Sequence, residues 1–233
     1  GGISVDKEIA LGLQAAPHMI QLHGGKYPDS RVQQRVARVG QRIVEQSDAR
    51  KSPYEFGFHV LRDERTVNAF ALPGGQIFIT KALLDRLRTE GQLAGVLAHE
   101  IAHVIARHGA EHIAKQQLTQ GLTGAAVIAA YDPQNPRSRA SAAIAVAIGQ
   151  LVNLKYGRDD ELESDRLGVR FMAQAGYDPR AMIQVMEVLR AASRGGTPPE
   201  FFSTHPNPEN RIGRIEQAIR DLFPRGVPEG LER

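Results

Sequence analysis

Two histidines four residues apart, His99 and His103, constrain this chain more than any other feature of its sequence. They lie in a segment, 92–117, whose apolar periodicity predicts one long α-helix. On a helix, residues i and i+4 lie on the same face, one turn apart. Two imidazoles in that arrangement can bind one tetrahedral metal ion, so we expect this helix to carry a zinc site.

A glutamate lies between these histidines. His99-Glu100-Ile101-Ala102-His103 matches the HExxH motif, in which two histidines bind zinc and the glutamate acts as general base. Zinc lowers the pKa of a water molecule, and the glutamate accepts its proton before attack on a peptide carbonyl. The motif therefore predicts one Zn²⁺ per chain and a peptidase with Glu100 as its general base.

A second pair of histidines competes for the metal. His108-Gly109-Ala110-Glu111-His112 fits the inverted HxxEH motif. On one continuous helix, this pair would point about 180° away from the first pair, so the two pairs could not share one ion. The helix alone leaves open which pair binds the metal.

The acidic segment 158–168 supplies the context that separates these alternatives. It contains an ExE-small-D pattern followed by glycine, and with the HExxH motif it resembles the gluzincin family of HtpX, the CAAX prenyl endopeptidases and the periplasmic BepA and LoiP peptidases. The resemblance favours the pair His99 and His103. It implies that Glu163, which precedes Ser164 and Asp165, is the third zinc ligand. Acidic residues on a helix usually face solvent, so we expect this of Asp159 and Glu161. Asp165 either faces solvent or orients a ligand from behind.

The same resemblance extends over residues 4–222 and implies a substrate groove. In this family the strand predicted at 76–80, after a Gly-Gly turn, is the edge of the sheet beside the zinc. An extended peptide can add to such an edge through backbone hydrogen bonds. We therefore expect substrate contacts at Asn68, Gly74, Gly75, Gln76 and Ile77. Asn68 also fits an ordinary residue at a strand end.

A late histidine, His205, lies between Thr204 and Pro206 in a loop rich in proline. The family places the matching residue near the zinc. Two roles stay open: an oxyanion donor in the transition state, or a fourth zinc ligand that keeps the enzyme latent. Arg211 follows and is expected to anchor this loop or to contact a carboxylate near the metal.

The remaining pattern predicts an α+β fold, mostly helical, with one small sheet whose edge strand borders the zinc cleft. We expect one zincin-type domain over residues 1–233, with an irregular tail at 223–233. Helices are predicted at 4–23, 30–46, 81–88, 92–117, 159–175, 179–192 and 209–222, with two more in the apolar segments 121–130 and 140–154. Strands are predicted at 55–61, 66–71 and 76–80, and a loop at 193–208.

Composition excludes several other classes of function. The chain has no cysteine, so thiolate chemistry and disulfides are excluded. A net charge of +3 without a basic run argues against a nucleic-acid partner. The apolar segments are too short to span a bilayer, and no signal peptide is recognised at the start.

The interpretation is an endopeptidase for unfolded or misassembled polypeptides. The family resemblance points to quality control in the periplasm or cell envelope of a bacterium, with a lipid anchor or other membrane tether outside this chain still compatible. A cytoplasmic location also remains open. The rival interpretation is a non-proteolytic chaperone-like or binding module with a latent zinc site.

Overall fold

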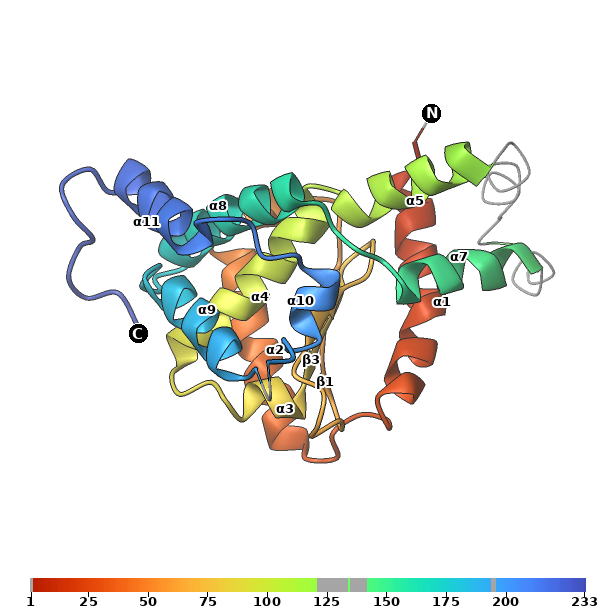
Figure 1. Ribbon diagram of the computed structural model, residues 1–233, viewed down its shortest axis with the longest axis horizontal. Coiled ribbons are helices and arrows are strands. Elements are labelled where there is room, and N and C mark those ends of the chain that lie inside the picture. Colours follow the sequence, from red (N-terminus) through yellow and green to blue (C-terminus); the bar gives the residue numbers. More distant parts are fainter. Residues whose placement is uncertain (1, 121–133, 135–141, 194–195) are drawn as a thin grey trace.

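The computed structural model describes residues 2–120, 134, 142–193 and 196–233 (Figure 1). It confirms the α+β class: many helices surround one three-stranded sheet. The elements are α1 (Val5–Leu22), α2 (Ser30–Glu45), the 3₁₀ helix η1 (Asp48–Lys51), β1 (Gly57–Leu61), β2 (Ala69–Ala71), β3 (Gln76–Thr80), α3 (Lys81–Leu84), α4 (Glu90–Ile105), α5 (His108–Gln120), α7 (Ala142–Val152), α8 (Arg158–Gln174), α9 (Ala181–Ala191), α10 (Phe201–Thr204) and α11 (Arg211–Leu222).

The helix predicted over 92–117 is in fact two helices. The HExxH helix α4 ends at Ile105, and α5 begins at His108. The break lies at Arg107, whose φ of 61° is left-handed and incompatible with a continuing α-helix. The orientation expected for His108 and His112 on one continuous helix is therefore wrong.

The sheet has the order β1-β3-β2, so β3 is its central strand. β1 pairs with it in parallel, and β2 pairs with it in antiparallel fashion. The prediction that 76–80 forms the sheet edge is therefore wrong. The chain leaves β1, forms β2, and only then turns through Leu72–Gly75 into the space between the two strands. The edge that lies against the HExxH helix is β2.

Each face of β3 contributes to a different apolar cluster. Ile77 and Ile79 join the main core with α2, α4, α8 and α9. Phe78 points to the opposite face and packs in a smaller cluster with α1 and α7. This alternation follows from the two-residue period of a strand. The sheet thus separates α1 and α7 from α4, the helix that carries His99 and His103 (Figure 1).

The apolar segments predicted as helices are only partly covered. Segment 121–130 lies outside the described residues, whereas 140–154 contains α7. Among the described helices, none is both long and apolar enough to cross a membrane. The loop predicted at 193–208 contains a short helix, α10, which pattern reasoning did not find.

Helix α1 contacts the β2–β3 turn closely, and Gly12 makes this possible. A Cβ built on Gly12 would lie 2.1 Å from the carbonyl oxygen of Pro73, which is backbone and cannot rotate away. Gly149, in α7, has open space around the same position. The two glycines therefore form a matched pair inside helices.

We expect Gly12→Ala to lower the free energy of unfolding by about 1–3 kcal/mol, because α1 must move away from the turn. Gly149→Ala should raise it by about 0.5–1 kcal/mol through higher helix propensity. Urea unfolding of both variants checks this. A stabilised Gly12→Ala protein would show that α1 does not pack as described.

Candidate metal centre

The HExxH helix α4 is buried on all its faces. Thr89 caps its N-terminus, accepting a hydrogen bond from the backbone N–H of Gln92 at 3.1 Å. All residues from Gly91 to Val104 are buried. A helix that is apolar all round belongs in a core. Its buried ionisable side chains, His99, Glu100 and His103, must therefore find partners within the protein.

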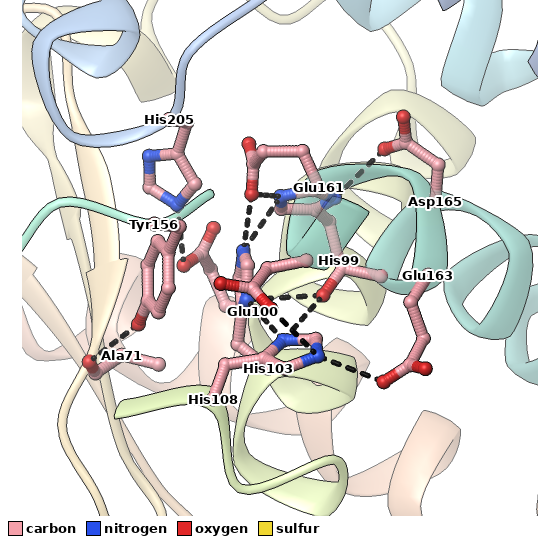
Figure 2. Close-up of polar contacts among 12 residues, drawn as sticks. Ala71, His99, Glu100, His103, His108, Tyr156, Glu161, Glu163, Asp165 and His205 are labelled. Carbon is pink, nitrogen blue, oxygen red and sulfur yellow. Dashed lines mark hydrogen bonds and ion pairs between the residues drawn. The ribbon is translucent and has the colours of Figure 1, made fainter. Parts of the chain in front are cut away.

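Four side chains converge beside α4. One nitrogen or carboxylate oxygen from each of His99, His103, Glu161 and His205 lies within 4.8 Å of all the others. All four side chains are buried. Figure 2 shows them pointing toward one another from α4, α8 and the end of α10. In the part of the chain that the structure describes, no other group of this kind is found.

The carboxylate in this cluster is Glu161, not Glu163 as the sequence predicted. The Oε2 atom of Glu161 lies 2.7 Å from His103 Nε2 and 3.3 Å from His99 Nε2. Glu163 instead lies at the helix surface, with 44% of its side chain exposed, and contacts His108. Residues two apart on a helix point about 200° apart, so the two glutamates cannot exchange places.

The face of α8 that meets α4 is set by Gly168. A Cβ on this residue would lie 3.3 Å from the backbone nitrogen of His99 and 3.1 Å from Met182. The absent side chain lets the two helices approach at the first histidine. Glu161 and Asp165 precede Gly168 by seven and three residues, so all three share one helix face. That spacing is the sequence signal that identifies Glu161.

The donor set fits zinc. Two imidazoles and a carboxylate are ligands that zinc accepts in catalytic sites. Ligands bound at 2.0–2.1 Å in a tetrahedron lie about 3.3 Å apart. The observed separations are 3.1 Å between His99 and His103, and 2.7 and 3.3 Å to Glu161. These atoms already have nearly the spacing that a small tetrahedral ion requires.

Burial and neighbouring charges shift the pKa values of the candidate ligands in different directions. Burial lowers the pKa of His103 to about 4, which keeps this imidazole neutral and able to donate a lone pair. Burial also opposes protonation of His99, but the carboxylates of Glu161 and Asp165 raise its pKa to about 10. For Glu161, burial opposes ionisation, but the imidazoles of His205, His99 and His103 hold its pKa well below the usual range. The carboxylate of Glu161 is therefore ionised although it is buried, which favours a cation among these side chains.

Behind the cluster, Asp165 and Arg211 form a buried ion pair. Arg211 Nε lies 2.7 Å from Asp165 Oδ2, and Arg211 Nη2 lies 3.4 Å from Glu161 Oε1. On its other side, Asp165 Oδ1 lies 2.9 Å from His99 Nδ1. Despite burial, Arg211 and His99 lower the pKa of Asp165. The pair therefore connects α11 to the ring of His99.

Glu100 and His205 face each other across the cluster. His205 Nε2 lies 3.2 Å from Glu100 Oε1, while Glu100 Oε2 is buried without a hydrogen-bond partner. His205 Nδ1 lies 3.1 Å from the carbonyl oxygen of Phe201, and the two rings stack 4.0 Å apart. With Nδ1 donating to this carbonyl, Nε2 points at the centre and donates to Glu100 Oε1, so Nε2 would have to give up that proton to bind a metal.

Sequence analysis also missed Tyr156. Its ring stacks on His103 with centroids 3.8 Å apart, and burial raises the pKa of its hydroxyl well above the usual value. The hydroxyl donates to the carbonyl of Ala71 on β2 at 3.4 Å, as drawn in Figure 2. Tyr156 belongs to no motif, so only the fold reveals its position.

Four of the residues expected to bind substrate have other contacts. Gly74 and Gly75 have positive φ and pack the β2–β3 turn closely against α1 and the residues before β1. Gln76 bonds to His59, and Ile77 is buried between two strands. Asn68 lies at the start of β2, with its backbone paired to Thr80 and its Oδ1 buried without a partner.

The segment that carries His205 contacts the outer side of the chain just before β2. The backbone carbonyl of Asn68 accepts from the N–H of Thr80, and the N–H of Leu72 donates to the carbonyl of Gln76. The backbone N–H and C=O groups of even-numbered residues here therefore point toward β3, and those of odd-numbered residues point away from it. On that outer side, the carbonyl of Val67 accepts from the N–H of Phe201 at 3.1 Å. The edge beside the metal centre is therefore partly occupied in this structure.

Comparison with known proteins agrees with this geometry. The profile of peptidase family M48 matches residues 30–219, which include α4, α8 and His205. The chain belongs to peptidase family M48. The resemblance stated from sequence is therefore confirmed, and the fold, the HExxH helix and the relatives support a zinc metalloendopeptidase.

The relatives that match this chain include two kinds of protease. The β-barrel assembly-enhancing protease of Escherichia coli K12 is 31% identical over 96% of this chain and 47% of its own length. The mitochondrial metalloendopeptidase OMA1 of Schizosaccharomyces pombe is 38% identical over 78% of this chain and 51% of its own length. The chain thus spans about half the length of the relatives it matches.

We expect Arg211→Ala to destabilise the protein by about 3–5 kcal/mol, because it leaves Asp165 and Glu161 as buried charges without their cation. Arg214→Ala, one turn along α11 and exposed, is the matched control and should change stability little. Urea unfolding of the two variants gives the comparison. Equal stabilities would mean that the buried pair contributes nothing.

Proposed function

We propose that this chain is the catalytic domain of a zinc endopeptidase that cleaves unfolded or misassembled proteins in the bacterial cell envelope. It would bind one zinc ion through His99, His103 and Glu161, with His205 as a displaceable fourth ligand. The observation that carries the proposal is the convergence of these four buried side chains beside the general base Glu100.

A zinc ion held by these residues would supply Lewis-acid activation of water and of the substrate carbonyl. The protein's own part is proton transfer and positioning. Glu100 Oε2, buried and without a partner, is placed to accept a proton from the attacking water and to return it to the leaving amine. Asp165 and Arg211 hold the ring of His99, while Tyr156 covers one face of His103.

The described state is closed, which supports a latent resting enzyme. His205 has no exposed surface, and its Nε2 atom faces Glu100 and the cluster. A substrate strand adding to β2 would need the outer side of that strand, where Phe201 now donates to Val67. Asn68, with a free Oδ1 beside this edge, would then accept from the peptide main chain. His205 would leave the cluster together with Phe201.

The cellular role rests on the relatives. The name of the E. coli relative refers to assembly of β-barrel proteins, and the S. pombe relative is mitochondrial. Proteins that fail to assemble expose extended segments, which are the substrates that strand addition selects. A bacterial envelope location follows for this chain if it shares the role of the first group.

The ligand assignment predicts different outcomes for two neighbouring glutamates. Glu161→Gln should weaken zinc binding by about 100-fold or more, because it removes the anionic ligand. Glu163→Gln should retain one zinc per chain. Metal analysis after dialysis compares them. Zinc retained in Glu161→Gln and lost in Glu163→Gln would restore the assignment made from sequence.

Glu100→Gln should retain zinc and lose about 10²–10⁴-fold in peptidase rate, since the amide cannot accept the proton. Cleavage of unfolded casein by the wild type, and its loss on chelation, measure the activity. A wild type that protects unfolded clients without cleaving them would favour the rival chaperone-like function. An active Glu100→Gln enzyme would remove Glu100 from the mechanism.

For His205→Ala, the two possible roles predict opposite signs. Loss of a latency ligand should raise basal casein cleavage, and this is the result we expect from the closed structure. Loss of an oxyanion donor would instead lower kcat by about 10²–10³. Unchanged kinetics and zinc content would leave His205 without a function at the site.

A further inference from the structure

His108 lies directly behind the metal centre, although it is not part of it. It is buried at the start of α5, between His103 on α4 and Glu163 on α8. Its Nδ1 lies 2.9 Å from His103 Nδ1, and its Nε2 lies 2.8 Å from Glu163 Oε1. Figure 2 shows the three side chains in a row leading away from the centre.

The positions of the protons in this row follow from simple rules. If His103 binds a metal through Nε2, its proton must be on Nδ1. The carboxylate of Glu163 can only accept, so His108 donates from Nε2 and presents a lone pair at Nδ1. That lone pair accepts the proton of His103. A doubly protonated His108 would place two N–H groups against each other at 2.9 Å.

We propose that Glu163 and His108 form a carboxylate–imidazole relay that orients His103 and strengthens it as a metal ligand. The proposal rests on the proposed function, because it assigns these residues a role toward the zinc held there. They are positioning residues, not ligands. Each metal-binding histidine would then be oriented by a carboxylate. His99 contacts Asp165 directly, and His103 is linked to Glu163 through the imidazole of His108.

The backbone break at Arg107 makes this contact possible. On a continuous helix, a residue five positions after His103 would point about 140° away from it. The left-handed Arg107 turns the chain so that His108 returns beneath His103. This conformation costs about 1–3 kcal/mol in a non-glycine residue. Glu8 of α1 holds the Arg107 side chain, with Nε and Oε2 3.1 Å apart.

Ser164 completes the environment of the two Nδ1 atoms. Its hydroxyl lies 3.0 Å from His103 Nδ1 and 3.4 Å from His108 Nδ1. The hydroxyl can accept from Nδ1 of His103 and donate to Nδ1 of His108. The hydrogen bonds then still run from His103 through His108 to Glu163, each donor facing an acceptor. Both routes end on the bond from His108 Nε2 to Glu163. The charge of Glu163 therefore acts on His103 by either route.

The test measures zinc affinity of the full 233-residue chain by competition with a chromophoric chelator. Glu163→Gln keeps an acceptor oxygen and removes the charge. We expect it to weaken zinc binding by about 3- to 10-fold, less than the 10- to 100-fold typical of a direct partner, because Glu163 is half-exposed. High salt should reduce this difference, since the charge is screened. His108→Ala should weaken binding by about 10- to 100-fold.

A double-variant cycle separates a relay from two independent effects. His108→Asn can still accept from His103 but has no nitrogen that reaches Glu163. If Glu163 acts through His108, adding Glu163→Gln to His108→Asn should produce no further loss of affinity. The matched control is His112→Asn. His112 also pairs with a carboxylate of α8, Asp160, at 2.6 Å, but has no polar contact with a metal ligand, so zinc affinity should not change.

Several outcomes would overturn the relay. Wild-type affinity in Glu163→Gln, additive losses in the double variant, or an equal loss in His112→Asn would each do so. Thermal unfolding of the metal-free proteins shows whether a loss reflects general destabilisation, which would also count against the relay. A wild type that binds no zinc would refute the proposed function itself, and this result is distinct from a wild type that binds zinc with Glu163→Gln unchanged.

Discussion

The rest of this structure depends on the close approach of two helices, α4 and α8, at one glycine. Because Gly168 has no side chain, the backbone of α8 reaches van der Waals distance of His99. The polar contacts between the histidines of α4 and the carboxylates of α8 follow from that approach. Glu161 reaches both histidines, and Asp165 reaches the far nitrogen of His99. A side chain at this position would require α4 or α8 to shift, because its Cβ would already lie 3.3 Å from the His99 backbone nitrogen.

Such an approach buries charges that would be unstable alone. Glu161 and Asp165 are both buried, and only cations in the same volume make this tolerable. Arg211 supplies one positive charge from α11, and the imidazole of His99, whose pKa is raised, supplies another. The last helix of the domain is thus part of the metal centre's electrostatic balance, although it lies far from the HExxH motif in sequence. Stability and metal binding are consequently linked through the same side chains.

Sequence reasoning located the centre but not its full composition. The spacing of His99 and His103 requires only one helix, so it could be interpreted locally. The family pattern favours Glu163, whereas the helical phase shared with Asp165 and Gly168 favours Glu161. The central position of β3 depends on a crossover that no local pattern encodes. Tyr156 and His108 reach the centre only because of the fold, and the left-handed Arg107 has no sequence signature.

The turn that carries His205 affects which polypeptides could reach the metal centre. Phe201 donates its N–H to the carbonyl of Val67 and offers its own carbonyl to His205. The Val67 carbonyl lies on the outer side of the sheet edge, the side that an incoming strand would use. The same short turn therefore occupies a backbone position that an added strand would use and places His205 in the candidate metal centre. If substrate adds as a strand to this edge, as proposed above, it must replace the contact from Phe201 with backbone hydrogen bonds of its own, which would favour extended segments over compact proteins.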